Sequence, residues 1–327
     1  MFFCQSVAQE KKSCGIAFGA ANAQALCFSA VTKCKSAGFI KIIILLHKYT
    51  KNAYFCNKIV TMTIREWIRN REIRGQATFC IADVANAFPS FSDDGIRIEL
   101  ARLIKGRLIM SPYRGFYVVI PPQYALKGNI PPSYYIDQLM VVLGKPYYVC
   151  LLTAAAMHGA THQRAMSTQV MTVLPRSRVS DRNRSLDWNY RSEIPSGLLY
   201  KINTETGTML YSCPELTAVD LVQYASKVGG YQRAATVLSE LCERLDIAKM
   251  KDVIPYTTMS SIRRLGFMLE FVLDEKGMSD ELYTIAATKK KRVWNTLLFS
   301  NSHAKSEYCQ SNRWNIDFNI DIEIDEL

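Results

Sequence analysis

The sequence lacks a long apolar run, closely paired cysteines and the glycine-rich motifs that hold phosphates or nucleophiles. Its longest apolar stretch, residues 39–46, is eight residues long and includes Lys41, whereas a membrane-spanning helix needs about 20 residues. The ten cysteines contain no C-x-x-C pair, which argues against a structural zinc site of the usual spacing. G-x-x-x-x-G-K-[ST], G-x-G-x-x-G and G-x-S-x-G are also absent. We therefore expect no membrane span, no metal, no other cofactor and no enzymatic activity.

The first sixty residues lack arginine, aspartate, proline and tryptophan, and they differ from the rest of the chain in charge. They hold eight lysines and one acid, Glu10, whereas the other 267 residues hold 32 basic and 28 acidic side chains. No amphipathic period in this segment is long enough to build a domain. Our hypothesis is that residues 1–61 are a non-native or disordered extension and that Met62 is the true initiator. A poorly ordered native extension is the alternative.

The remaining chain is only mildly basic, so a DNA partner has to be argued from local charge placement. Five cysteines lie in the first sixty residues, and the other five are scattered singly through the remainder. Scattered single cysteines predict buried thiols in a reducing compartment, and thus a cytoplasmic protein.

Residues 62–122 have the pattern of three short helices followed by a hairpin. Thr63 and Glu66 have capping-box spacing at the start of the first helix. Apolar residues then recur at helical spacing in three segments, and two strand-like segments follow around a basic turn. The first expected helix ends near Gly75, the second covers 81–88 and the third covers 93–105. The expected strands cover 108–110 and 115–120. This order predicts a winged helix-turn-helix DNA-binding domain.

The third helix is the expected recognition helix, with Ser92 as its N-cap. Its expected inward side chains are Ile96, Leu100, Leu103 and Ile104. The basic residues expected to contact DNA are Arg97, Arg102, Lys105, Arg107 and Arg114. The first two reach bases or phosphates, and the other three contact the backbone. Asp93 and Asp94 would repel phosphate at the N-terminal tip of this helix. The segment carries nine basic and six acidic residues, so a solvated helix face and a protein-binding winged helix remain alternatives.

Residues 123–327 predict a second domain with mixed secondary structure. The expected helices cover 134–143, 147–158, 215–227, 231–245 and 260–276. The expected strands cover 170–174, 198–202 and 208–211, the last two forming a hairpin. In the tail, isoleucine or phenylalanine alternates with polar residues from Ile316 to Ile324, which predicts a half-buried strand anchored by Trp314. The predicted fold class is α+β, with an N-terminal winged helix-turn-helix followed by a mixed α+β C-terminal domain.

Two groups of distinctive residues in the second domain allow more than one interpretation. His158 and His162 have the spacing of metal-binding helices, but a glycine stands where a metalloprotease has its glutamate and no third ligand is near. We expect a structural or polar-surface role for them; a nucleic-acid-processing enzyme that uses them with nearby acids is a third hypothesis. The segment 164–191 holds six arginines with Trp188 and Tyr190 interleaved. Such a segment can bind RNA or DNA by stacking, but it is more commonly a solvated loop.

Five short runs are similar to those of one protein family. They are SPYRGFY at 111–117, PPSYYID at 131–137, PYYV at 146–149, AAAMHGATHQ at 154–163 and PELTAVDLV at 214–222. Together they resemble the AbiEi-type antitoxins of type IV toxin–antitoxin systems, over roughly residues 62–320.

The resemblance implies a phage-defence protein with two activities. Its winged helix would repress its own operon by binding operator DNA, and its C-terminal domain would neutralise a nucleotidyltransferase-like toxin without a stable complex. Because toxins of that family act on nucleotides or RNA, the resemblance directs the search for an antitoxin surface to a set of arginines. These are Arg164, Arg176, Arg178, Arg182 and Arg184. The alternative function is a winged-helix transcriptional regulator whose C-terminal domain senses a ligand or partner.

Overall fold

The computed structural model describes residues 62–126, 130–160, 166–174, 185–288, 295, 297–299, 312–317, 319–320 and 322. From Thr63 onward these residues belong to one compact unit. Residues 1–61 lie outside the described residues, so the structure does not test the hypothesis that they are a non-native or disordered extension. Within the described part of the chain, no helix combines the length and apolarity needed to cross a membrane.

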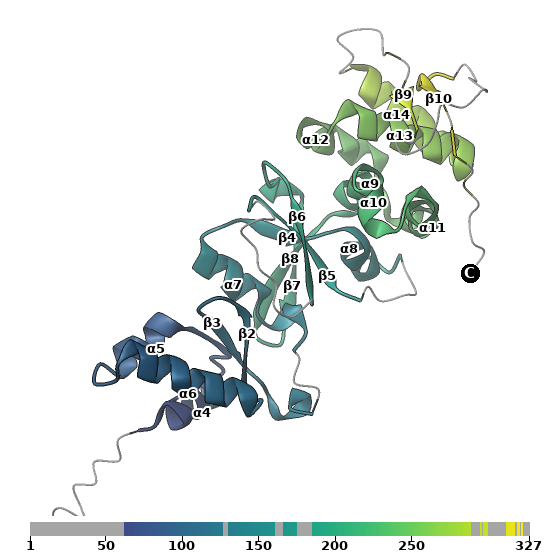
Figure 1. Cartoon of the computed structure of the whole chain (residues 1–327). Helices are drawn as coiled ribbons and strands as arrows, with labels where there is room; N and C mark the ends of the chain where they lie inside the picture. The colour runs from purple at the N-terminus through teal and green to yellow at the C-terminus, as the bar shows by residue number, and fades with distance from the viewer. Residues whose placement is uncertain are drawn as a thin grey trace, which may run out of the picture. The chain divides into compact units, whose positions relative to one another are not determined.

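The described residues form a mixture of helices and strands (Figure 1). The helices are α4 (Ile64–Ile73), α5 (Ile81–Ala87), α6 (Asp93–Lys105), α7 (Ile136–Leu143), α8 (Leu151–Met157), α9 (Pro214–Gln223), α10 (Ala225–Val228), α11 (Tyr231–Leu241), α12 (Met250–Val253), α13 (Met259–Phe267) and α14 (Lys276–Thr288). The strands are β1 (Thr78–Cys80), β2 (Ile109–Tyr113), β3 (Phe116–Val119), β4 (Tyr147–Val149), β5 (Thr168–Thr172), β6 (Leu186–Tyr190), β7 (Leu199–Thr204), β8 (Gly207–Ser212), β9 (Leu297–Leu298) and β10 (Ile316–Asp317). The predicted α+β class is confirmed.

The N-terminal helices begin where the sequence places their caps. Thr63 and Glu66 form the predicted capping box, in which the Glu66 backbone N–H donates to Thr63 Oγ1 at 3.2 Å and the Thr63 N–H donates to Glu66 Oε2 at 2.8 Å. At α6, Ser92 Oγ accepts a hydrogen bond from the Gly95 N–H at 3.1 Å. Each cap satisfies backbone donors that a helix N-terminus leaves without partners.

The apolar face of α6 packs into a core formed with α4, α5 and one face of the first sheet. Ile96, Leu100 and Leu103 are buried there, as predicted. The prediction that Ile104 also faces inward is wrong, because its side chain is 40 % exposed. At about 100° of rotation per residue, the other three cluster around one direction and Ile104 falls on the flank of the helix.

The first sheet is antiparallel in the order β1-β3-β2 and is buried on both faces. Along β3, Phe116 and Val118 point into one core while Tyr117 and Val119 point into the other. This is the period-two alternation of a strand. The core on the Phe116 side also contains Tyr135 of the second half of the chain, so the sheet lies between two apolar cores.

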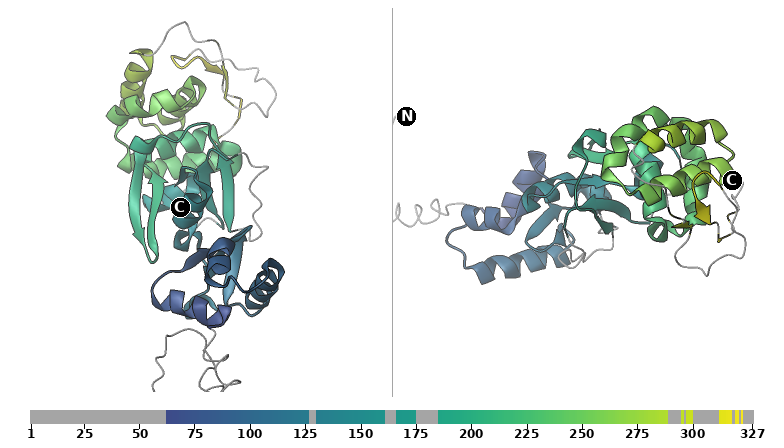
Figure 2. Two further views of the ribbon diagram at one scale, coloured as in Figure 1. Left: turned by 90° about the vertical axis from the view of Figure 1, so that its left-hand side faces the viewer. Right: turned by 90° about the horizontal axis from the view of Figure 1, so that it is seen from above.

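The second sheet is mixed, in the order β6-β5-β4-β8-β7. Strand β4 lies at its centre, antiparallel to β5 and parallel to β8. Tyr147 and Val149 face a core with α7, and Tyr148 faces a core with α8 and α9. Helices α7 and α8 therefore cover opposite faces of this sheet (Figure 1 and Figure 2).

The prediction of one helix over residues 147–158 is wrong. The structure divides this stretch into strand β4 and helix α8, with Leu151 at a φ of 54° where the two meet. A central strand is apolar on both faces, so its first residues do not show the alternation that separates a strand from a buried helix. Pairing with β5 and β8 decides the outcome.

Other predicted elements are present with shifted ends. The predicted hairpin is formed by β7 and β8, which pair from Leu199↔Ser212 to Thr204↔Gly207. The helix expected over 215–227 is broken at Tyr224 into α9 and α10, and the helix expected over 260–276 ends in a π-helical turn at Met268–Val272.

The C-terminal segment docks through Trp314, as predicted. The Trp314 side chain is fully buried, and β10 pairs in parallel with β9. The sequence predicts a strand from Ile316 to Ile324, but β10 covers Ile316–Asp317 and the described residues 319, 320 and 322 are not in a strand. The other residues of the predicted strand lie outside the described residues. Of the four cysteines in the described part of the chain, Cys150, Cys213 and Cys242 are buried, as expected, and Cys80 is half-buried.

Candidate nucleic-acid interface

The outer face of α6 carries the basic residues that the sequence singled out. Lys105 lies opposite the buried face of this helix, Arg97 and Arg102 lie to either side of Lys105, and all three are exposed. The side chains of Arg97 and Arg102 are 65 % and 73 % exposed. Both arginines can therefore reach a partner outside the protein without movement of the backbone.

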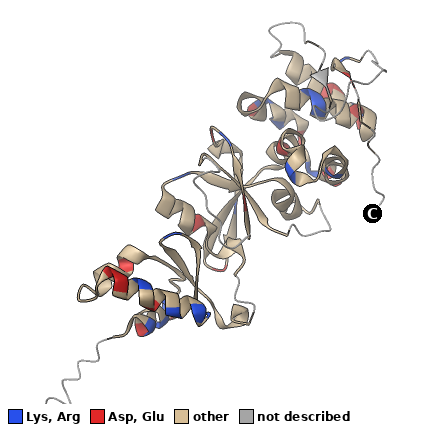
Figure 3. Cartoon of the chain, in the orientation of Figure 1, with Lys and Arg blue, Asp and Glu red and all other residues tan. Residues whose placement is uncertain are grey.

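Acidic residues on the same helix accompany these arginines (Figure 3). Arg97 Nη1 lies 3.9 Å from Asp94 Oδ1, and Arg102 Nη1 donates to Glu99 Oε2 at 3.2 Å. Exposed pairs three residues apart contribute about 0–1 kcal/mol. Either arginine can therefore exchange its carboxylate for a phosphate or a base edge at small cost.

The other two predicted DNA contacts lie away from the outer face of α6. Arg107 follows the helix at a φ of 54°, and its Nη1 donates to the Leu126 carbonyl at 2.9 Å. Arg114 is exposed at the β2–β3 turn. The next residue, Gly115, accepts a hydrogen bond from the Ile81 N–H at 3.0 Å, which places this turn beside the start of α5.

The outer face of α6 also has an apolar centre that the sequence analysis did not identify. Ile98 is 55 % exposed, and Ala101, three residues further along the helix, is exposed as well. Both lie between the directions of Arg97 and Arg102 on the helix. The signal was available in the sequence, since an isoleucine interrupts the otherwise polar side of an amphipathic helix.

The candidate antitoxin surface lies outside the described residues. This applies to Arg164, Arg176, Arg178, Arg182 and Arg184, and to His162. Arg191, the sixth arginine of the basic stretch, is described, and its side chain is only 5 % exposed. Arg191 therefore does not contribute to a nucleic-acid surface.

Arg191 instead forms a buried ion pair at the junction of β6, β4 and α9. Its Nη1 donates to Asp220 Oδ1 at 2.9 Å and also to the hydroxyl oxygen of Tyr148, while its Nη2 donates to the Tyr256 carbonyl at 3.0 Å. The Tyr148 hydroxyl donates to Asp220 Oδ2 at 2.7 Å. Both carboxylate oxygens of the fully buried Asp220 thus have donors.

Burial dominates the electrostatics of this cluster. It raises the pKa of Asp220, although Arg191 and Tyr148 act in the opposite direction. It also raises the pKa of Tyr148 well above the ordinary value, with the Asp220 charge as a further cause. Burial is the largest influence on the pKa of Arg191 and would lower it, but the Asp220 charge and the contacts with Tyr148 together outweigh burial, and the pKa is raised. The guanidinium is therefore permanently charged, and it depends on Asp220 for compensation.

A hydrogen bond and two aromatic contacts hold the His158 side chain in place. Its Nε2 lies 2.8 Å from the Ser212 carbonyl oxygen, and its ring packs against Tyr200 and Tyr211 with centroid distances of 6.1 and 5.3 Å. Burial lowers the pKa of His158. Among the residues that the structure describes, no three His, Cys, Asp or Glu side chains converge on a possible metal position.

The comparisons with known proteins find a similarity to an antitoxin family in the middle of the chain. Residues 147–271 match the family model described as the AbiEi antitoxin C-terminal domain. The chain is also similar to the crystal structure of the RV2827C protein from Mycobacterium tuberculosis, with a TM-score of 0.55 and 14 % identity over 76 % of this chain and 88 % of that one. At this identity the likeness concerns the fold alone. No curated protein sequence matches the chain significantly.

The family match confirms the predicted resemblance to AbiEi-type antitoxins. It supports an antitoxin role and, in general terms, a toxin as the partner. The matched range includes Tyr148, Arg191, Asp220 and Tyr256, so the buried ion pair lies within the part of the chain that matches the family model.

Proposed function

We propose that the chain is a DNA-binding antitoxin of the type IV class that acts in the cytoplasm in phage defence. On this proposal residues 62–122 are a winged helix-turn-helix that binds operator DNA and represses the chain's own operon. Residues 123–327 neutralise a nucleotidyltransferase-like toxin by functional antagonism, without a stable complex. The match to the AbiEi antitoxin C-terminal domain supports the antitoxin half.

The observation that carries the DNA half is the exposure of the arginines on α6. The order α4, β1, α5, α6, β2, β3, with the sheet order β1-β3-β2, is the order expected of a winged helix and supports this part of the proposal. In that architecture the helix before the hairpin docks in the major groove. Here that helix is α6, and Arg97 and Arg102 extend from its outer face into solvent.

The distribution of charge favours the middle of α6 as the reading surface. Asp93 and Asp94 are exposed at its first turn and repel phosphate. Arg97 and Arg102 are the candidates for base contacts, because guanidinium groups form bidentate hydrogen bonds with guanine. Lys105, Arg107 and Arg114 are candidates for backbone contacts, which set affinity and salt dependence rather than sequence preference.

The DNA half is tested by binding to the promoter of the chain's own operon. Fluorescence anisotropy with that DNA should show a higher Kd for Arg97→Ala and for Arg102→Ala. The loss of binding free energy should be about 1–3 kcal/mol for a residue that contacts bases. Arg244→Ala removes an equal charge from an exposed position in the second half of the chain and is the matched control. Unchanged affinity for both α6 variants would contradict the assignment.

The antitoxin half is tested by co-expression with the neighbouring toxin gene and by measurement of growth. The full chain should rescue growth, and the Arg97→Ala/Arg102→Ala double variant should still rescue it while repression is lost. Replacement of the five candidate arginines, Arg164, Arg176, Arg178, Arg182 and Arg184, by alanine should abolish rescue while repression persists. DNA binding without any growth rescue by the full chain would instead favour the regulator with a sensing C-terminal domain.

A further inference from the structure

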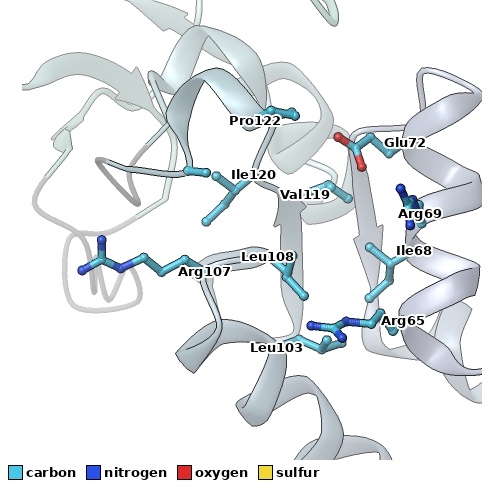
Figure 4. Close-up of a pocket in the computed structure, with 11 residues that line it drawn as sticks. Arg65, Ile68, Arg69, Glu72, Leu103, Arg107, Leu108, Val119, Ile120 and Pro122 are labelled. Carbon is cyan, nitrogen blue, oxygen red and sulfur yellow. The ribbon is translucent and has the colours of Figure 1, made fainter.

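A surface pocket of about 440 Å³ lies between α4, the turn after α6 and the segment that follows β3 (Figure 4). Its floor is apolar and is formed by side chains that are otherwise buried in the core: Ile68, Leu103, Val119 and Ile120. Pro122 and Ala125 form one wall. Small-molecule sites in proteins commonly have volumes of about 300–1,000 Å³ and apolar linings with a few polar groups. The size and the floor of this pocket fit an organic molecule.

Two arginines from α4 supply positive charge at one side of the pocket. Arg65 and Arg69 are one helical turn apart and lie on either side of Ile68 in sequence, so all three share a face. Figure 4 shows the Arg65 side chain extending from α4 toward Leu103. Neither guanidinium has a hydrogen bond or an ion pair to another residue in the part of the chain that the structure describes. Both are exposed and available to an anion.

The other charged groups restrict the kind of anion. Glu72 lies one turn further along α4 and also lines the pocket. Arg107 lines it too, but in Figure 4 its guanidinium points away from α4, where it is held by the Leu126 carbonyl. The positive charge is thus concentrated at Arg65 and Arg69, and a carboxylate stands at the Glu72 end.

This arrangement fits one negative group attached to an apolar body. A guanidinium binds a carboxylate through two parallel hydrogen bonds and stacks on aromatic planes. A nucleic-acid backbone or an acidic peptide would bring repeated negative charges past Glu72, and like charges repel. We propose that this pocket is a binding site for a monoanionic aromatic carboxylate, with its acid group at Arg65 and Arg69 and its ring over Ile68 and Val119. The site does not depend on the proposed binding of DNA.

The test uses isothermal titration calorimetry of the full chain with naphthoate and with its neutral analogue naphthamide. Naphthoate should bind with a Kd below about 1 mM, and naphthamide should bind more weakly. The Arg65→Gln/Arg69→Gln variant should weaken naphthoate binding by about 10- to 100-fold, since each lost contact is a hydrogen bond to a charged group. Glu72→Gln should strengthen it.

The matched control is Arg97→Gln/Arg102→Gln, which removes the same charge from exposed positions on α6 and should leave naphthoate binding unchanged. Circular dichroism and thermal melts should show that all three variants keep the wild-type fold. Three results would overturn the proposal: no heat of binding with the wild-type chain, equal affinity for naphthoate and naphthamide, or equal losses in the two double variants. The last result would indicate a response to net charge and not to this pocket.

Discussion

The buried pair of Arg191 and Asp220 gives a direct test of the energetics described above. Replacing Asp220 with alanine removes the acceptor of two hydrogen bonds, 2.7 Å from the Tyr148 hydroxyl and 2.9 Å from Arg191 Nη1. Arg191 keeps the Tyr256 carbonyl as an acceptor. Its charge, however, stays in a site where the side chain is 5 % exposed and loses its only counter-ion in the part of the chain that the structure describes.

The expected cost follows from that uncompensated charge. Removing one partner of a buried ion pair destabilises a protein by about 3–5 kcal/mol, because the remaining ion stays desolvated. Replacing both partners with apolar residues of similar volume is often neutral. Asp220→Ala should therefore lower the free energy of unfolding by about 3–5 kcal/mol. The double variant Asp220→Leu/Arg191→Met should recover most of this loss.

Urea denaturation of the full chain near neutral pH, followed by circular dichroism, measures these changes. Glu99→Ala breaks the exposed pair with Arg102 and serves as the control, with an expected change below about 1 kcal/mol. If Asp220→Ala behaved like Glu99→Ala, or if the double variant were less stable than Asp220→Ala, the description of this cluster as a desolvated ion pair would be wrong.

Three further predictions concern stability. Gly266→Ala should lower the free energy of unfolding by about 1–3 kcal/mol, because a Cβ there would overlap the buried Trp314 ring, whereas Gly277→Ala, with open space around it, should not. Burial lowers the pKa of His158, so the unfolded chain binds the proton more readily and the free energy of unfolding should fall as pH drops through about 6.5. Urea titrations between neutral and mildly acidic pH should show that His158→Gln reduces this dependence. Thr63→Ala should cost about 1 kcal/mol through loss of the N-cap, measured as a lower urea midpoint, and an unchanged midpoint would show that the first turn of α4 frays in the native state.

Local signals in the sequence were sufficient for the first part of the fold. Helix α6 has the predicted bounds because Ser92 caps it, two aspartates favour its first turn and an apolar face runs along it. Residues 147–158 carried no such signal. Tyr148 and Val149 are both buried in a strand whose neighbours come from distant parts of the chain, and a propensity summed over nearby residues cannot include those neighbours.

The candidate site shows the same division between local and distant information. The outward direction of Arg97 and Arg102 follows from helical periodicity, and the structure agrees with it. The burial of Arg191 does not follow from its neighbours, because its counter-ion Asp220 lies 29 residues away on another element. Arg65 and Arg69 were readable as a basic pair, but the pocket beside them exists only after β3 and the segment around Ala125 pack against α4.

The two apolar cores on either side of the first sheet limit how the proposed activities can be separated. Phe116 and Val118 of β3 share a core with Tyr135, Leu139 and Tyr147. Residues 62–122 alone would expose that face of the first sheet to water, because Tyr135, Leu139 and Tyr147 cover it. Here the face is apolar and covered, so a chain cut between residues 122 and 123 would expose apolar side chains on both fragments, at about 25 cal/mol for each Å² of apolar surface.

Loss of growth rescue by such a fragment would therefore report misfolding as readily as loss of an antitoxin surface. Substitutions on the outer face of α6 leave both cores intact, and they are the changes that can assign repression and neutralisation to different parts of the chain.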